Sequence, residues 1–178
     1  MYPWLRAAGV AARALASPVD PAQQQPLALA LRVWPNDCDA NLHLNNGRYL
    51  TLADLGRMDF FLRHRWWRRL AGRRWNVVAT SVHVLYRRSL DLGQRYRLVT
   101  QIAGTNERFL LMEQRFQRQG RTCCILYVSI GVIDSRGLVA IEDVRTALGV
   151  ALPAPPHAAE LARQVDIAIL DDLDGTST

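Results

Sequence analysis

The chain has 178 residues, of which 49% are hydrophobic, and this is enough for one globular domain with a sizeable core. It contains 22 arginines, no lysine and 16 acidic residues, and no apolar run reaches the roughly 20 residues that a membrane-spanning helix needs. The composition therefore excludes a membrane-spanning protein.

The charges are distributed unevenly along the chain. Residues 1–133 hold 19 arginines and eight acidic residues, whereas residues 134–178 hold three arginines and eight acidic residues. The basic part is expected to attract anions such as phosphorylated cofactors, nucleic acid or an acidic membrane surface. Charge alone does not choose among these partners.

The cysteines and histidines do not indicate a disulfide framework or a metal site. Three cysteines cannot all pair, and Cys123 and Cys124 are neighbours in an apolar run. The four histidines are scattered, and none stands at zinc-ligand spacing from a cysteine or another histidine. We therefore expect reduced cysteines in or near the core, a cytoplasmic protein, and no metal or other cofactor.

The first 26 residues are expected to form an N-terminal helix and a linker. Residues 1–16 contain Arg6 and Arg13, no acidic residue and few large apolar side chains. We expect a helix that docks loosely on the domain; the alternative is an interfacial helix that gives peripheral contact with a membrane. Prolines and three glutamines in residues 17–26 predict the linker.

The densest polar stretch of the chain, residues 37–49, separates a predicted strand from a predicted helix. The run 27–34 has strand character, and the segment 49–62 has helical spacing with a narrow polar stripe on an otherwise apolar surface. Carboxylates and carboxamides cap helices, and the open amides of a first helical turn bind anions or polarise carbonyls. The pattern predicts an acidic loop that faces the N-terminus of a long helix.

Four strand-like segments follow this helix and complete an α+β fold. An exposed turn is expected at 63–74, and the last strand is apolar on both faces, which predicts a place inside the sheet. We expect a curved five-stranded antiparallel sheet wrapped around one long helix. The strands are predicted at about 78–86, 96–103, 109–117 and 122–133.

The end of the chain is expected to lie outside this sheet. A short helix is predicted at 142–150, and a proline-rich linker and C-terminal tail, with an amphipathic piece at 157–170, occupy 151–178.

The acidic loop contains the motif D-x-N-x-H-x-N-N-x-x-Y, formed by Asp39, Asn41, His43, Asn45, Asn46 and Tyr49. The order of elements and this loop together resemble the hot-dog fold thioesterases. The resemblance covers about residues 27–150; it is to the 4-hydroxybenzoyl-CoA thioesterase branch, and the loop is also similar to that of acyl-ACP thioesterases. It implies a hot-dog fold and thioester hydrolysis.

The resemblance also implies roles for the loop residues. Asp39 matches the catalytic carboxylate, Asn41 and His43 match an assisting polar pair, and the backbone amide near Asn46 matches the donor that polarises the thioester carbonyl. Leu42 stands where many relatives have glycine.

These residue types also suit thioester hydrolysis on chemical grounds alone, apart from the resemblance. A carboxylate serves as general base or as nucleophile, and an amide at a helix N-terminus stabilises an oxyanion by roughly 3 kcal/mol. Asp39, Asn41 and His43 occupy alternate positions, so an extended loop would turn their side chains to one side. Asp37, closer to the strand end, is expected to form a turn.

Four further residues are predicted to contact substrate, each with a structural alternative. Tyr49 and Tyr86 are expected to bind substrate, and Arg87 and Arg88 at the end of a strand are expected to hold phosphates. Tyr49 suits the core better than a catalytic role, and the two arginines are equally suited to a solvated face. Asn45 and Asn46 suit helix capping, which is compatible with catalysis.

The sequence therefore predicts an acyl thioesterase for acyl-CoA or acyl-carrier-protein substrates. A non-catalytic acyl- or lipid-binding hot-dog protein is the main alternative. A nucleic-acid-binding module that uses Trp66, Trp67 and Trp75 among arginines, and a hot-dog dehydratase, are disfavoured. Because one sheet cannot cover the apolar helix on all sides, a homodimer joined edge to edge is expected, with a homotetramer as the alternative.

Overall fold

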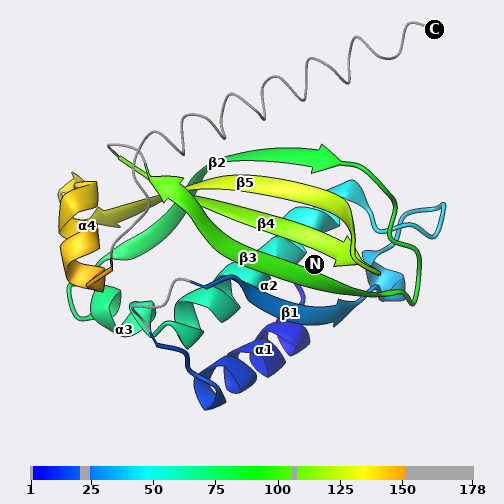
Figure 1. Cartoon of the computed structure of the whole chain (residues 1–178), viewed down its shortest axis with the longest axis horizontal. Coiled ribbons are helices and arrows are strands. Elements are labelled where there is room, and N and C mark those ends of the chain that lie inside the picture. The colour runs from blue at the N-terminus through cyan, green and yellow to red at the C-terminus, as the bar shows by residue number, and fades with distance from the viewer. Residues whose placement is uncertain (1, 21–24, 106–107, 151–178) are drawn as a thin grey trace, which may run out of the picture.

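An antiparallel sheet curls around one long helix in the computed structural model, which describes residues 2–20, 25–105 and 108–150 (Figure 1). The strand order is β1-β3-β4-β5-β2, and the two-residue strand β6 adds to β5. The α+β prediction is confirmed, and β5 lies inside the sheet as expected. The strands are β1 Leu27–Arg32, β2 Asn76–Tyr86, β3 Arg95–Thr105, β4 Leu110–Arg118, β5 Arg121–Asp134 and β6 Gly137–Leu138.

The long helix α2, Asn46–Arg63, crosses the concave face of the sheet and confirms the helix predicted from residue 49. It approaches the sheet closely at Gly56, where an added Cβ would lie 2.7 Å from side-chain atoms of Leu98 and Thr100. Buried Gln114 joins the two layers, because its amide nitrogen donates to the Ala53 carbonyl over 2.9 Å. A side chain at position 56 would therefore push the helix off the sheet.

The N-terminal helix α1, Trp4–Ala16, packs along α2 (Figure 1). Its inward face buries Ala7, Val10 and Ala14, while Arg13 pairs over 3.1 Å with Asp59, a buried carboxylate of α2. The predicted N-terminal helix is present, and its buried face and ion pair fix it to α2 rather than leave it loosely docked. In the described part of the chain, no helix combines the length and the apolar character that crossing a membrane requires.

Two further helices lie at one end of the sheet (Figure 1). Helix α4, Ile141–Leu148, confirms the predicted short helix. Helix α3, Trp66–Ala71, occupies the middle of the exposed turn expected at 63–74, so that expectation was wrong over these residues, whereas 72–74 do form an exposed turn. The cause is Trp66, which is fully buried with its ring centroid 5.5 Å from that of Phe60. Burial of this large ring outweighs the high local charge, and it removes Trp66 as a stacking surface for nucleic acid.

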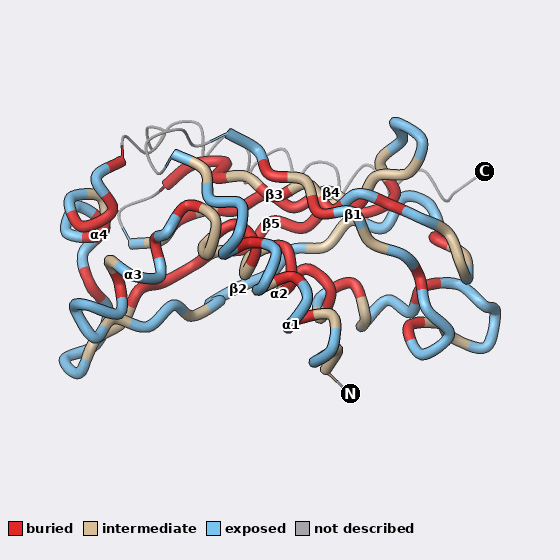
Figure 2. The backbone as a smooth tube through the Cα atoms, turned by 90° about the horizontal axis from the view of Figure 1, so that it is seen from below, coloured by how far each residue is buried: buried red, intermediate tan, exposed pale blue. Residues whose placement is uncertain are grey.

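The core lies between the sheet and α2, whereas the edge strand β2 is largely exposed (Figure 2). Only three of its eleven residues are partly buried, and the rest are exposed. The predicted amphipathic piece at 157–170 and the tail lie outside the described residues.

Candidate active site

The acidic loop between β1 and α2, residues 33–45, is fixed by backbone hydrogen bonds. The Asn45 amide donates to the Asp37 carbonyl over 2.9 Å, which joins the two sides of the loop. The Leu44 amide donates over 2.7 Å to the Leu90 carbonyl, in the connection between β2 and β3. The loop is therefore held both internally and from the neighbouring connection.

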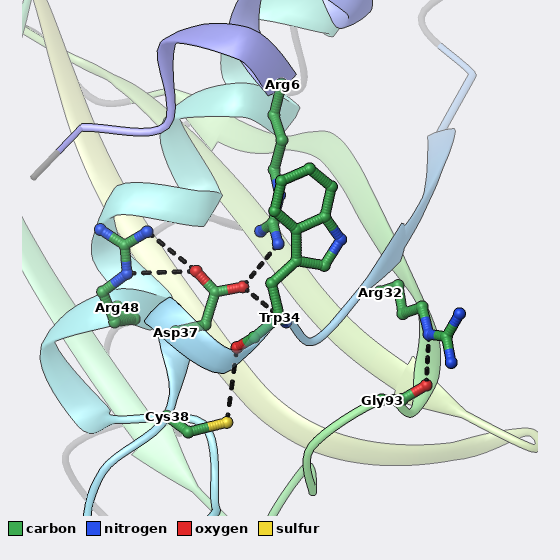
Figure 3. Close-up of polar contacts among 7 residues, drawn as sticks. All are labelled: Arg6, Arg32, Trp34, Asp37, Cys38, Arg48 and Gly93. Carbon is green, nitrogen blue, oxygen red and sulfur yellow. Dashed lines mark hydrogen bonds and ion pairs between the residues drawn. The ribbon is translucent and has the colours of Figure 1, made fainter.

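Asp37 anchors the start of this loop (Figure 3). It ends the 3-10 helix Pro35–Asp37 and is fully buried. Its Oδ1 accepts from Arg48 Nη2 over 2.8 Å, while its Oδ2 accepts from the Trp34 amide over 3.0 Å and lies 2.7 Å from Arg6 Nη2. The bond to the Trp34 amide confirms the predicted turn. The two ion pairs add a structural role that the sequence did not indicate.

Asp39 closes a tight turn within the same loop. Its Oδ1 accepts from the backbone amides of Asn41 at 2.9 Å and His43 at 3.3 Å. Leu42 adopts a left-handed conformation with φ 59°, which a glycine would adopt without strain and which costs a leucine about 1 kcal/mol. Among the described residues, Asp39 Oδ2 has no hydrogen-bond partner, so one carboxylate oxygen is available to a substrate or water.

The start of α2 leaves one amide open beside this turn. Asn45 caps the helix, because its side-chain oxygen accepts from the Gly47 amide over 2.9 Å and its carbonyl accepts from the Arg48 amide over 2.8 Å. The Asn46 amide has no acceptor in the described part of the chain. Asn45 is thus the cap, and Asn46 is the first helical residue. An open amide at this end of a helix is a suitable donor to an oxyanion.

These groups surround a cavity of about 280 Å³ between the acidic loop, the start of α2 and the end of β2. Seven of the eight predicted site residues line it, and Asn41 does not. Because Asp39 folds the loop into a turn, the extended arrangement expected for positions 39, 41 and 43 was wrong. The lining consists of Asp39, His43, Leu44, Asn46, Tyr49, Tyr86, Arg87, Arg88 and Ser89.

The two tyrosines of the cavity have different environments. Tyr49 is a buried core residue, and its ring contacts that of Phe116 edge to face at 4.9 Å between centroids. Tyr86 is 45% exposed, and its hydroxyl donates to the Asn46 carbonyl over 2.9 Å. This bond links the end of β2 to the start of α2 and positions the open amide.

The two arginines that follow β2 line the cavity. Both backbone amides donate to the Cys123 carbonyl, over 2.8 Å from Arg87 and 3.0 Å from Arg88. The Arg88 side chain also donates to the Thr122 carbonyl over 3.1 Å. In the described ranges, neither guanidinium pairs with a carboxylate, which leaves both positive charges available to an anion.

His43 has a neighbour that sequence reasoning missed. Its Nε2 lies 3.6 Å from Asp91 Oδ1, and both side chains are about half exposed. The sequence placed Asp91 only in a turn, and no local pattern connects it with a histidine 48 residues earlier. Protonated His43 would form an ion pair with Asp91, and its backbone amide rather than its ring contacts Asp39.

The described residues contain no group of three or more His, Cys, Asp or Glu side chains that could hold a metal ion. The cavity instead combines a carboxylate oxygen, an open helix amide and positive charge. This combination can activate a water or attack a carbonyl directly, stabilise an oxyanion and attract an anionic substrate.

Comparisons with curated proteins give partial matches. Protein THEM6 from Xenopus laevis is 32% identical over 84 residues, which are 47% of this chain and 41% of that protein. Protein THEM6 from Danio rerio is 34% identical over 85 residues, 48% of this chain and 42% of that protein. The matched part of this chain thus spans about two fifths of the length of these relatives.

Solved structures match the fold over most of their length. A probable thioesterase from Escherichia coli, YbaW, has a TM-score of 0.62 and 20% identity, with 68% of this chain and 96% of that chain covered. The BH1999 gentisyl-coenzyme A thioesterase has a TM-score of 0.59 and 15% identity, with 66% and 98% covered. Protein SAV2348 from Staphylococcus aureus, in complex with CoA, has a TM-score of 0.60 and 15% identity, with 70% and 82% covered.

The family model of the thioesterase-like superfamily matches residues 33–162, which include the acidic loop, α2 and the sheet from β2 onward. This match extends over more than half of the chain and agrees with the curled sheet around α2. The chain therefore belongs to the thioesterase-like superfamily and has the hot-dog fold.

Proposed function

We propose that this protein is an acyl thioesterase that hydrolyses acyl-CoA or acyl-carrier-protein thioesters. The observation that carries the proposal is that Asp39 and the open Asn46 amide line the same cavity. Among the described residues, Asp39 Oδ2 has no hydrogen-bond partner. The thioester carbonyl would accept from the Asn46 amide, while Asp39 attacks it or takes a proton from the attacking water. Water completes the reaction and releases a carboxylic acid and a thiol.

The roles of the other cavity residues follow from their positions. Tyr86 would hold the helix start through its bond to the Asn46 carbonyl. His43 would orient water or move a proton at the exposed side of the cavity, with Asp91 to steady its charged form. Asn41 would support the turn through its backbone amide rather than through its side chain.

The relatives in solved structures support CoA as one carrier, because SAV2348 is in complex with CoA and BH1999 is a gentisyl-coenzyme A thioesterase. The test is a panel of aryl-, short- and long-chain acyl-CoA and acyl-carrier-protein thioesters, with release of thiol as the readout. We expect turnover of at least one class. Acyl-CoA binding without turnover of any thioester would replace the proposal with the acyl-binding alternative.

Neutralisation of Arg87 and Arg88 should weaken the binding of an acyl-CoA substrate. We expect Arg87→Gln/Arg88→Gln to raise KM about fivefold or more at low salt, with kcat little changed, because the guanidinium charges attract phosphates without touching the reacting carbonyl. The increase should shrink as salt screens the charges. Steady-state kinetics at two salt concentrations give both values.

The charge-matched control for this variant is Arg65→Gln/Arg74→Gln. Both arginines are exposed and lie outside the lining of the cavity. KM should remain within about twofold of the unaltered protein. Equal KM values for the two double variants would place the phosphates elsewhere.

We also propose that two copies of the chain join along β2. This edge strand has eleven residues, and Val77 and Val82 are each 38% exposed. A long apolar edge favours pairing with another strand, and pairing here would place a second chain beside Tyr86 and the cavity. Light scattering should give a molar mass of about twice the 20.1 kDa of the chain. For Val82→Lys, the measured mass should shift toward that of the monomer. A monomer at every concentration would contradict the dimer.

A further inference from the structure

A second cavity, of about 560 Å³, lies at the end of the sheet where β1 ends and β3 begins. It shares no lining residue with the cavity of Asp39. Its lining contains five arginines and no acidic residue, so its electrostatic potential favours an anion. The arginines are Arg6, Arg32, Arg95, Arg97 and Arg118, and they come from α1, β1, β3 and the end of β4.

Two buried polar groups of this cavity have unsatisfied hydrogen-bonding capacity. The Arg6 side chain is only 7% exposed; its Nη2 pairs with Asp37 over 2.7 Å, but its Nη1 has no hydrogen-bond partner in the described ranges. The hydroxyl of Tyr96, a residue only 3% exposed, is also without a partner there. Buried polar groups are nearly always hydrogen-bonded. Both groups donate, so together they point to an absent acceptor.

The protonation of Tyr96 agrees with this role. Burial raises the pKa of the Tyr96 hydroxyl above its ordinary value, so it remains a donor at any physiological pH. The guanidinium of Arg6 donates only. An anion with several oxygens satisfies both residues, whereas an apolar ligand satisfies neither.

The remaining arginines have spare donors. Arg32 donates its Nε–H to the Gly93 carbonyl over 2.8 Å, and its two terminal nitrogens take no part in that bond (Figure 3). Within the described part of the chain, Arg95, Arg97 and Arg118 pair with no carboxylate. Guanidinium groups bind phosphate oxygens in pairs, which makes phosphate the anion that suits such a cluster best.

An aromatic ring completes the cavity. The Arg6 guanidinium lies 4.0 Å from the centroid of the Trp34 ring, and Trp34 is 42% exposed (Figure 3). The exposed part of the indole offers a stacking surface to a flat ring. A purine or pyrimidine base attached to the phosphates would use both features.

We propose that this cavity is a binding site for a phosphorylated nucleotide, held by its phosphates on the arginines and Tyr96 and by its base on Trp34. The site is separate from the reaction cavity, and the proposal stands whether or not the protein hydrolyses thioesters. Two sources share this chemistry: a free nucleotide, and the nucleotide end of a CoA thioester.

Calorimetry on the full chain at about 50 mM salt tests the site with adenosine 3′,5′-bisphosphate, inorganic pyrophosphate and adenosine. We expect the bisphosphate to bind most tightly, pyrophosphate more weakly, and adenosine not measurably. Arg95→Gln/Arg97→Gln should raise the Kd of the bisphosphate at least about tenfold, because two phosphate contacts are lost. The control Arg65→Gln/Arg74→Gln should change it less than about twofold.

Tyr96→Phe provides a second measurement that does not depend on the arginines. Without ligand, removal of an unsatisfied buried hydroxyl should leave Tm equal or higher. With saturating bisphosphate, the ligand-induced rise in Tm should be smaller than in the unaltered protein. A lower Tm without ligand would show that the hydroxyl already has a partner, and it would remove the central observation of the proposal.

Three outcomes of the calorimetry would overturn the site: no binding of either phosphorylated ligand, equal binding of adenosine, or equal loss in the two double variants. Where the bisphosphate binds as expected, the KM of Arg95→Gln/Arg97→Gln for an acyl-CoA identifies the source. A raised KM assigns the cavity to the nucleotide end of the substrate. An unchanged KM assigns it to a separate nucleotide.

Discussion

Asp39→Asn should lower kcat for thioester hydrolysis at least about a hundredfold, with Tm little changed. The substitution keeps the shape of the side chain, and an amide oxygen can still accept from the Asn41 and His43 amides. The turn and the cavity should therefore persist. What is lost is the negative charge on Oδ2, and with it the base or nucleophile of the proposed reaction.

Two further variants separate this effect from a general loss of charge. His43→Ala should cost less than Asp39→Asn, because the His43 ring lies beside Asp91 and only its backbone contacts Asp39. Glu142→Gln removes a carboxylate that is 73% exposed, on α4 and outside the cavity, so kcat should not change. If the Asp39→Asn protein hydrolyses thioesters as fast as the unaltered protein, the carboxylate mechanism is contradicted.

Asp37→Asn should instead lower stability by about 3 kcal/mol or more, although it lies only two residues away. Asp37 is fully buried between Arg6, 7% exposed, and Arg48, 14% exposed. Loss of the carboxylate charge leaves two largely buried guanidinium groups without their counter-ion. For a chain of this size the expected fall in Tm is about 10 °C. Thermal and denaturant unfolding measure it.

A second substitution tests whether the ion pair is the cause. Asp37→Asn/Arg6→Met removes one of the two guanidinium groups together with the carboxylate charge, and it should recover part of the lost stability. If Asp37→Asn has the same Tm as the unaltered protein, the pairing of Asp37 with Arg6 and Arg48 contributes little to stability. Asp37 and Asp39 would then both contribute little to stability, and they would differ only in their role in the proposed reaction.

The sequence by itself determined the order of the five long strands and of helices α1, α2 and α4, because this depends on local periodicity. Alternating or continuous apolar runs defined the strands, polar residues at every third position from residue 48 defined α2, and the polar run before this helix defined the acidic loop. The choice of Asp39 over Asp37 as the candidate carboxylate also came from the loop motif. The superfamily match covers both aspartates and does not test that choice.

Only the tertiary structure decided which side chains meet, because contacts between distant segments leave no local pattern. The packing of α1 brings Arg6 to Asp37, which also pairs with Arg48 of α2. The packing of the connection between β2 and β3 brings Asp91 to His43. Burial of Trp66 created α3 in a segment whose charges predicted a turn. The number of arginines in the sequence indicated only that the chain is basic. The curl of the sheet and the packing of α1 place five of them around one cavity.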